Sequence, residues 1–348
     1  MPYVFGVDGG GSTCRAILIT ESGRVVFYGK GAGVNYHEVG ASTAVRTIEK
    51  LYQEALSKAR ARKDECIGIG LGLAGAGRAK DQEILTPLFH DAFGNTPFLL
   101  TTDADIALTS GTLSDSGIIV IAGTGAMIYG RNEAEECSRV GGYGPLVSDE
   151  GGGYRIGLEA LRRVVRAYDG CDLETLLSER ILAHFELKTF EDLISWVNSA
   201  EATREQIASI APLVMRAATE NDPVADELMN EAADALAIGV EALHQRLQFP
   251  DRFEVVLSGG LLTNSTNYAQ VVRRKILYLL PGATITPPKM EPVFGAALFA
   301  YSLTGQTIDQ DLLDTIQLTY REYSDRQNST NATRESALAA ASAETENE

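Results

Sequence analysis

The chain has 348 residues, with 47 acidic against 30 basic side chains and a formal net charge of −17. This length predicts two α/β domains with a cleft between them, and so acidic a surface should repel nucleic acid and anionic membranes. Because the first residues run straight into a hydrophobic strand and no apolar run approaches about twenty residues, we expect a cytoplasmic protein that binds small molecules.

A glycine-rich turn lies between two hydrophobic runs, residues 3–7 and 16–19, which predict a strand on either side. The turn reads Asp8, Gly9, Gly10, Gly11, Ser12 and Thr13. Because glycine has no Cβ, the backbone N–H groups of such a turn can point at a phosphate from close range, and the two hydroxyls add donors. The turn has neither the lysine of a P-loop nor an immediately following helix. We therefore expect a hairpin that cradles phosphate, with ordinary turn geometry as the alternative.

Asp8 stands just before this turn. A carboxylate beside phosphates can hold Mg²⁺ through water, so Asp8 is the candidate metal residue. Its alternative role is to accept a local hydrogen bond in an Asx turn.

Strands and helices alternate through the rest of the first half. We expect strands at 24–28, 66–73 and 98–101, and helices at 42–61, 84–93 and from 105 onward. These elements complete a first domain at residues 1–112. A second domain follows at 113–324, and residues 325–348, with almost no large apolar side chains, are expected to form a disordered tail.

Asp103 follows the strand at 98–101, at the carboxyl end where open α/β sheets place ligands. Phosphoryl transfer commonly uses a carboxylate that accepts the proton of the attacking hydroxyl, so Asp103 is the candidate general base. Asp105 competes for this role, although an acidic residue in a first helical turn is also explained by capping or by the helix dipole.

The second domain opens on another strand–turn–strand pattern. Residues 118–121 and 127–129 flank a turn made of Gly123, Thr124 and Gly125. We expect the two hairpins to hold one polyphosphate between them. A later strand at 252–257 enters Ser258, Gly259 and Gly260, where a nucleotide base could approach the backbone.

Helical periodicity dominates the second domain. The predicted helices are 158–168, 173–185, 189–198, 204–220, 223–248, 270–280 and 293–303. This domain should therefore be the more helical of the two.

Residues 141–153 form a glycine-rich polar segment that precedes a helix. Tyr143 is a single aromatic among glycines, and Asp149 follows it. This combination suits a sugar, since a ring can stack on its apolar face while a carboxylate accepts hydrogen bonds from its hydroxyls.

Taken in order, these motifs resemble the sugar kinases of the actin, Hsp70 and hexokinase superfamily, and within it the N-acetylglucosamine kinases of the BadF/BadG/BcrA/BcrD ATPase type. The resemblance covers roughly residues 3–303, with residues 8–13 similar to the first phosphate loop, 121–125 to the second and 257–260 to the adenosine motif. It implies two ribonuclease H-like (actin-like ATPase) domains flanking a cleft.

The resemblance also implies roles for individual residues. Asp103 would be the catalytic base and would touch the sugar. The other implied sugar contacts are Asn35, Ala74, Gly75, Gly142, Tyr143 and Asp149. The implied ATP contacts are Gly9, Gly10, Gly11, Ser12, Thr13, Gly123, Thr124, Gly125, Gly259 and Gly260. Tyr143 stands where the animal enzymes carry Trp and Ala74 where they carry Ser, which leaves the acetamido contacts open.

The implied reaction is transfer of the γ-phosphoryl group of ATP, with Mg²⁺, to the 6-hydroxyl of N-acetylglucosamine. Glucosamine and N-acetylmuramic acid remain alternative substrates, and a homodimer remains open. An ATPase that activates a CoA-ester dehydratase or reductase is another alternative, but its iron–sulfur cluster needs a cysteine setting that four scattered cysteines do not provide. A non-catalytic sugar or nucleotide sensor is the third class, and no DNA-binding module is found to support it.

Overall fold

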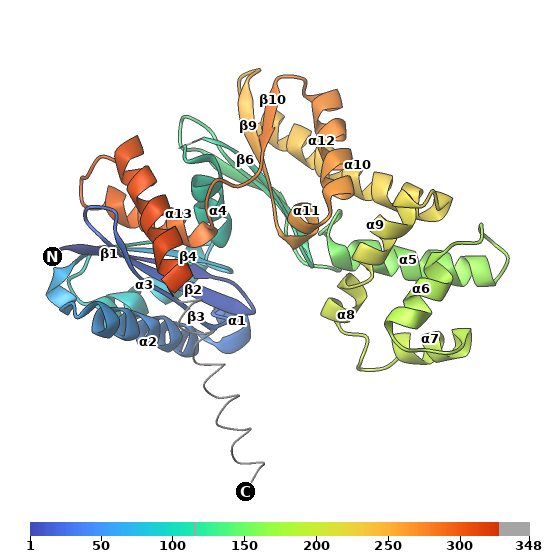
Figure 1. Ribbon diagram of the computed structural model, residues 1–348, viewed down its shortest axis with the longest axis horizontal. Helices are drawn as coiled ribbons and strands as arrows, with labels where there is room; N and C mark the ends of the chain where they lie inside the picture. Colours follow the sequence, from blue (N-terminus) through green and yellow to red (C-terminus); the bar gives the residue numbers. More distant parts are fainter. Residues whose placement is uncertain (115, 327–348) are drawn as a thin grey trace, which may run out of the picture. The chain divides into compact units, whose positions relative to one another are not determined.

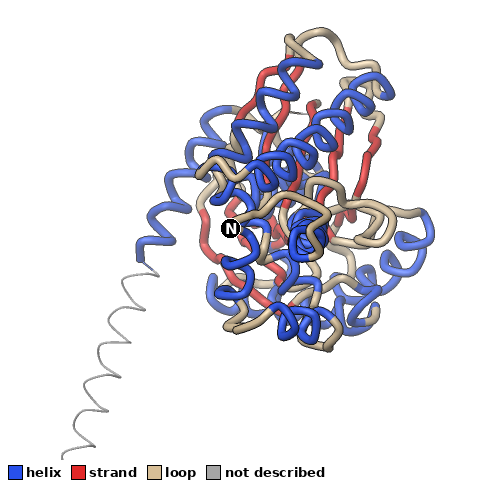
Figure 2. The backbone as a smooth tube through the Cα atoms, turned by 90° about the vertical axis from the view of Figure 1, so that its right-hand side faces the viewer, coloured by secondary structure: helices blue, strands red, loops and turns tan. Residues whose placement is uncertain are grey.

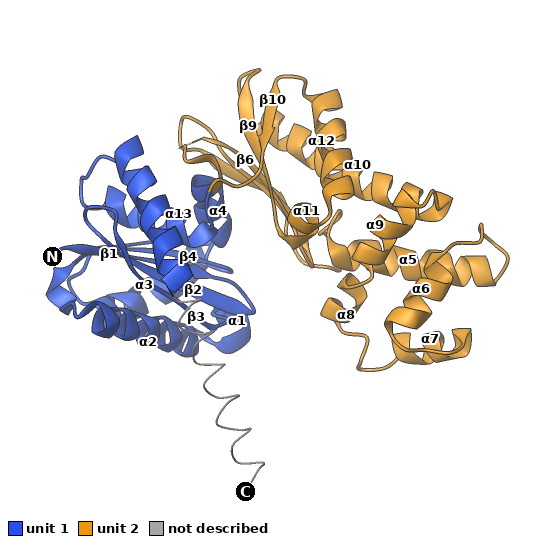
Figure 3. Ribbon diagram, in the orientation of Figure 1, with its two compact units in different colours: residues 1–110, 290–348 blue, residues 111–289 orange. Residues whose placement is uncertain are grey.

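The structure, a computed structural model, describes residues 1–114 and 116–326, which form two compact units (Figures 1 and 3). Unit 1 consists of Met1–Ser110 together with the chain from Met290 onward, and unit 2 is Gly111–Lys289. Each unit contains one five-stranded mixed sheet. Figure 2 shows the strands flanked by helices. The predicted α/β class with two domains is therefore confirmed.

The sheet of unit 1 has the order β3-β2-β1-β4-β5. Its strands are β1 (Tyr3–Gly9), β2 (Thr13–Thr20), β3 (Val25–Ala32), β4 (Cys66–Leu73) and β5 (Phe98–Thr101). The first three are antiparallel neighbours, while β4 and β5 run parallel to β1. The carboxyl ends of β1, β4 and β5 thus meet at one edge, which is where Asp8 and Asp103 lie.

In β4, large apolar residues alternate with glycines, so the two faces of the sheet carry different side chains. Ile69, Leu71 and Leu73 join a buried cluster with side chains of α2 (Ala41–Ala59) and α3 (Ala79–Phe93). The intervening glycines face the other way, and a Cβ at Gly70 would lie 1.8 Å from the carbonyl oxygen of Ala296. This glycine face lets α13 (Pro292–Ser302) pack directly against the sheet.

The packing of α13 corrects the predicted domain boundary. The sequence predicts residues 290–324 in the second domain, but they belong to unit 1. The helix at 310–326 belongs there too, since the hydroxyl of Thr319 accepts a hydrogen bond from the backbone N–H of Val25 over 3.1 Å. The helical spacing of apolar residues predicts that a segment is a helix, but it does not predict against which sheet the helix packs. Residues 325 and 326, expected in the tail, are helical, and 327–348 lie outside the described residues.

The sheet of unit 2 repeats the topology of unit 1, with the order β8-β7-β6-β9-β10 when read in the same direction. Its strands are β6 (Gly117–Ala122), β7 (Ala126–Arg131), β8 (Cys137–Gly141), β9 (Phe253–Ser258) and β10 (Ala283–Thr286). β6 and β7 form the second predicted hairpin, and β9 and β10 run parallel to β6. Two strands, β8 and β10, are not predicted from the sequence, because both are short and carry few large apolar side chains.

Unit 2 carries most of the helices, as predicted. They are α5 (Gly153–Tyr168), α6 (Leu177–His184), α7 (Phe190–Val197), α8 (Arg204–Ala208), α9 (Ala211–Thr219), α10 (Pro223–Arg246), α11 (Gly260–Asn264) and α12 (Thr266–Leu279). The predicted helix at 204–220 is broken into α8 and α9, because Pro212 has no N–H to continue the ladder. No helix among the described residues is long and apolar enough to cross a membrane.

Unit 1 has three further short elements. They are α1 (Tyr36–Val39), the 3₁₀ turn η1 (Lys63–Glu65) and α4 (Asp103–Thr112).

Candidate functional site

The first glycine turn joins β1 to β2 and has the predicted hairpin form. The backbone N–H of Gly10 donates to the carbonyl of Thr13 over 3.0 Å, and the carbonyl of Gly10 accepts from Val34 over 3.0 Å. A Cβ at Gly33 would lie 1.6 Å from the carbonyl oxygen of Gly11, so the following loop packs directly on the turn. Gly11, Ser12 and Thr13 are exposed. Their backbone N–H groups and hydroxyls can therefore reach a ligand.

Asp8 is buried at the end of β1, with only 8% of its surface exposed. It is the register partner of Arg15, whose Nη1 lies 3.4 Å from Oδ2 of Asp8. Burial raises the pKa of Asp8 to about 6; Arg15 opposes this shift, while the negative charges of Asp103 and Glu291 add to it. Mg²⁺ that accompanies a nucleotide takes one or two carboxylates, phosphate oxygens and water. A single carboxylate beside an exposed glycine turn, where phosphates are expected, fits that donor set.

Asp103 is the first residue of α4, directly after β5 and Thr102. Its Oδ1 accepts a hydrogen bond from the backbone N–H of Ala104 over 3.0 Å, and the residue is half-buried. Asp105 is more deeply buried and accepts a hydrogen bond from the hydroxyl of Thr101 over 2.8 Å. Of the two candidate bases, Asp103 is the more accessible and the one whose charge acts on Asp8.

Three predicted sugar residues gather beside the first turn. The backbone N–H of Ala74 donates to the carbonyl of Gly9 over 2.8 Å. Gly75 has a φ of +83°, and a Cβ there would lie 2.8 Å from Oδ1 of Asn35 and 2.9 Å from Cδ2 of His37. Asn35 in turn caps α1, since its Oδ1 accepts from the backbone N–H of His37 over 3.2 Å. The chain thus brings these residues together on one side of the turn.

Glu38 belongs to the same group, although it is part of no motif recognised in the sequence. Its Oε1 accepts a hydrogen bond from Nδ2 of Asn35 over 2.9 Å. Both carboxylate oxygens lie 3.6 Å from where a Cβ at Gly11 would stand. A cap residue followed three positions later by Glu is typical of a helix start, and this was the available signal.

The second glycine turn is held against the start of α5. The backbone N–H groups of Gly153 and Tyr154 donate to the carbonyls of Gly123 and Thr124, each over 2.8 Å. The side chain of Asp149 packs directly against Gly125, since a Cβ added there would lie 2.4 Å from Oδ2 of Asp149. The second glycine turn and the predicted sugar carboxylate therefore adjoin each other.

Asp149 and Tyr143 have contrasting surroundings. Asp149 is 5% exposed; its Oδ1 accepts from the backbone N–H of Gly144 over 3.2 Å and its Oδ2 from Arg204 over 2.9 Å. Burial raises the pKa of Asp149, against the opposing influence of that N–H and of Arg204. Tyr143 is 59% exposed, and its ring centroid lies 4.6 Å from the guanidinium carbon of Arg139. The preceding Gly142, with a φ of +70°, packs on Met127.

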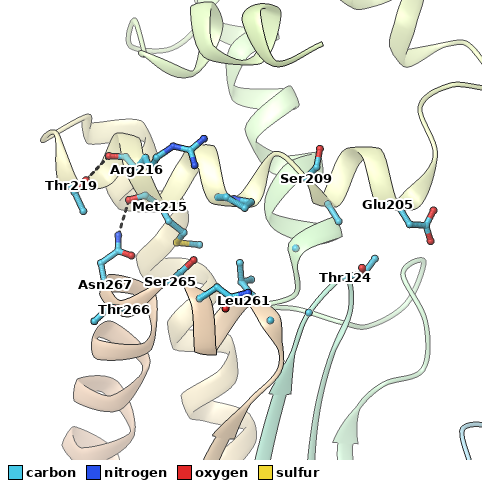
Figure 4. A pocket seen from close by; sticks show the side chains of 16 residues that line it. Thr124, Glu205, Ser209, Met215, Arg216, Thr219, Leu261, Ser265, Thr266 and Asn267 are labelled. Atoms are coloured by element: carbon cyan, nitrogen blue, oxygen red, sulfur yellow. Dashed lines mark hydrogen bonds between the residues drawn. The ribbon is translucent and has the colours of Figure 1, made fainter. Parts of the chain in front are cut away.

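Unit 2 also holds a cavity of about 870 Å³ beside the second turn (Figure 4). Three predicted nucleotide residues line it: Gly123, Thr124 and Gly260. Gly259, at the neighbouring turn, has a φ of +92°, and a Cβ there would lie 2.3 Å from the carbonyl oxygen of Ala122. The volume is that of pockets for small-molecule ligands.

Most of the other walls of this cavity come from segments outside the motifs recognised in the sequence. In Figure 4, Ser209, Met215 and Arg216 of the α8–α9 segment lie opposite residues at the start of α12. Nδ2 of Asn267 donates to the carbonyl of Met215 over 2.7 Å and ties the two walls together. The polar run at 264–267, which three residues separate from the turn at Gly259 and Gly260, is the signal available in the sequence.

Comparison with known proteins finds relatives along most of the chain. The chain is 33% identical over 303 residues to the N-acetylmuramic acid/N-acetylglucosamine kinase of Clostridium acetobutylicum, covering 87% of this chain and 99% of that relative. It is 29% identical over 307 residues to the N-acetyl-D-glucosamine kinase of Dictyostelium discoideum, covering 85% of this chain and 96% of that relative.

A solved structure from Chromobacterium violaceum, provisionally named an N-acetylglucosamine kinase, has a TM-score of 0.70 at 25% identity, covering 86% of this chain and 99% of its own. This likeness confirms the predicted fold of two actin-like α/β domains. The profile of the BadF/BadG/BcrA/BcrD ATPase family matches residues 5–300, and the chain belongs to that family.

Proposed function

We propose that the protein is an ATP-dependent kinase that phosphorylates the 6-hydroxyl of an amino sugar, with N-acetylglucosamine as the first substrate to test. The observation that carries this proposal is the position of Asp8 and Asp103 at one edge of the unit 1 sheet, beside an exposed glycine turn. A carboxylate for a phosphate-bound metal and a carboxylate for a proton are what phosphoryl transfer to a hydroxyl requires.

In this reaction Asp103 accepts the proton of the attacking sugar hydroxyl. Asp8 is the residue that would hold Mg²⁺ through water, and Mg²⁺ would neutralise charge on the phosphates. In unit 1, Gly11, Ser12 and Thr13 supply donors to the phosphates, and Gly9 and Gly10 let the backbone of the turn approach them.

In unit 2, the turn of Gly123, Thr124 and Gly125 also binds the phosphates of ATP. The cavity beside them receives the adenosine, with Gly259 and Gly260 at its edge. Its size and its position next to the second turn support this assignment.

The sugar contacts are assigned on each unit separately. Unit 1 offers Asn35, Ala74 and Gly75, which lie together beside the first turn. Unit 2 offers Gly142 and Tyr143, the latter an exposed ring, and Asp149. N-acetylglucosamine is placed first because it stands in the names of both relatives described above.

The test is ADP release, coupled to a spectrophotometric readout, with Mg²⁺-ATP and a panel of acceptors: N-acetylglucosamine, glucosamine, N-acetylmuramic acid, glucose and water. Fast turnover with an amino sugar and slow turnover with water supports the kinase. N-acetylglucosamine that lacks its 6-hydroxyl is the matched control, and it should release no ADP above the water rate. Equal ADP release without any sugar would overturn the proposal and favour an ATPase that activates another enzyme.

A further inference from the structure

Arg204 stands over the second glycine turn, although it belongs to none of the motifs considered above. It is the first residue of α8, and its Nη2 lies 2.7 Å from where a Cβ at Gly125 would be. Its neighbours in sequence and space, Glu205 and Thr124, line the cavity of unit 2. A guanidinium group therefore lies against Gly125 of the turn, next to residues that line the cavity.

In the structure this guanidinium is paired with Asp149. The Nη2–Oδ2 distance is 2.9 Å, and the side chain of Arg204 is 40% exposed against 6% for Asp149. The arginine is thus the partly solvated member of the pair, and the carboxylate is the buried one. A buried carboxylate needs hydrogen bonds to its charged form, so Arg204 can leave it only when another donor replaces the guanidinium.

We propose that Arg204 is a phosphate-binding residue that exchanges partners during the reaction cycle. Without ligands it pairs with Asp149; with a nucleoside triphosphate bound, it turns to the phosphate oxygens over the second turn. This inference rests on the proposed function, because the donor that replaces Arg204 on Asp149 is a hydroxyl of the sugar.

The chemistry of the groups favours this exchange. A guanidinium presents its N–H groups in a planar fork that matches phosphate oxygens, and a triphosphate carries more charge than one carboxylate. Each ligand therefore favours binding of the other. A bound phosphate stabilises Arg204 away from Asp149, and a sugar hydroxyl then donates to the buried carboxylate in place of the guanidinium. Nucleotide and sugar should bind with positive coupling, which by thermodynamic linkage acts equally in both directions.

The experiment uses Arg204→Gln, Arg204→Lys and a matched control, Arg162→Gln. Arg162 lies on α5, where it is exposed and pairs with Glu159. For each protein, calorimetry gives the affinity for a non-hydrolysable ATP analogue alone, and the affinity for N-acetylglucosamine with and without that analogue. Kinetics give the KM for ATP. Thermal melts check that each variant is folded.

In the wild-type and control proteins, we expect the analogue to tighten sugar binding about 5- to 50-fold. Arg204→Gln should raise the KM for ATP about 10- to 100-fold and abolish the coupling, and Arg204→Lys should retain part of both. A KM for ATP within twofold of wild type in folded Arg204→Gln, or full coupling in that variant, would overturn the inference.

Asp149→Asn distinguishes two roles of Arg204: binding of phosphate, and structural support of the second glycine turn through its pair with Asp149. This variant frees Arg204, so the KM for ATP should stay level or fall while the KM for the sugar rises. An equal rise in the KM for ATP in Asp149→Asn and Arg204→Gln would show that the pair only holds the turn in shape. The analogue-affinity arm tests Arg204 even if the wild-type protein phosphorylates no amino sugar, so the two failures can be told apart.

Discussion

The side-chain amide of Asn35 donates a hydrogen bond to Oε1 of Glu38 over 2.9 Å and so holds a carboxylate beside the first glycine turn. Because Asn35 is a proposed sugar residue, this places a fixed negative charge next to the proposed sugar site. Such a charge should oppose acceptors that are themselves anionic.

We therefore predict that Glu38→Gln changes which amino sugar is preferred. N-acetylmuramic acid carries a carboxylate that N-acetylglucosamine lacks, so removing the charge should raise its kcat/KM relative to N-acetylglucosamine roughly 3- to 30-fold. Steady-state kinetics with both sugars measure the ratio. Glu54→Gln, on α2 and paired with Lys58, is the control and should leave the ratio unchanged. An unchanged ratio in Glu38→Gln would mean that Glu38 does not face the acceptor.

Asp103→Asn should remove the general base while the fold and nucleotide binding persist. We expect turnover to fall on the order of 10²- to 10⁴-fold with an unchanged affinity for an ATP analogue. Asp105→Asn is the matched control, since an amide can still accept the hydrogen bond from Thr101, and its turnover should stay within about tenfold. Single-turnover assays of both variants decide between them, and the opposite pattern would assign the base to Asp105.

The sequence predicted the parts of the site that consist of local pattern. Both glycine hairpins have the expected form, because a hydrophobic run, glycines and a second hydrophobic run determine a turn without help from distant residues. Asp103 was placed by the same logic, at the end of a strand.

What the sequence could not predict are contacts between segments far apart in the chain. Arg204 meets Asp149 across 55 positions, and Asn267 meets Met215 across 52. No local pattern records either contact, since each depends on how α8, α9 and α12 pack. The same reason explains the misplaced α13, whose small residues match the glycine face of β4.

Tyr143→Ala should weaken sugar binding with little effect on ATP. The ring is exposed, so its loss removes a stacking surface and leaves the core intact. We expect the KM for the sugar to rise about 3- to 10-fold with an unchanged KM for ATP. Tyr278→Ala, which removes an 85% exposed tyrosine from α12, is the control. Equal sugar KM values in the two variants would refute the contact.

Gly70→Ala tests the packing of α13 on the sheet of unit 1. A strand normally tolerates alanine, but here the added Cβ would meet the carbonyl oxygen of Ala296 at 1.8 Å. We expect a loss of about 3 kcal/mol or more in the free energy of unfolding, measured by urea denaturation. Gly123→Ala adds a Cβ that meets no atom within 4 Å and should cost far less. A wild-type denaturation curve for Gly70→Ala would be incompatible with α13 lying against β4.

Asp81, buried at the start of α3, should make the stability of unit 1 depend on pH. Burial works against its charged form, but hydrogen bonds from the hydroxyl of Tyr36 and the backbone N–H of Arg78, with the nearby charge of His37, outweigh it and lower the pKa of Asp81 from 3.8. Between the unfolded and folded pKa values, the folded protein therefore binds fewer protons than the unfolded chain. Stability from Asp81 is fully present above about pH 4 and is lost as pH falls through the folded pKa.

Asp81→Asn should accordingly lower the free energy of unfolding by about 1–3 kcal/mol at pH 7, because it weakens hydrogen bonds to a charged group. The difference from wild type should shrink as denaturation is repeated at pH 5, 4 and 3, since protonation removes the same charge from the wild-type protein. Asp91→Asn, at an exposed position on the same helix, is the control and should cost little at any pH. If Asp81→Asn lowers the free energy of unfolding by the same amount down to pH 3, then packing, and not the charge of Asp81, stabilises the start of α3.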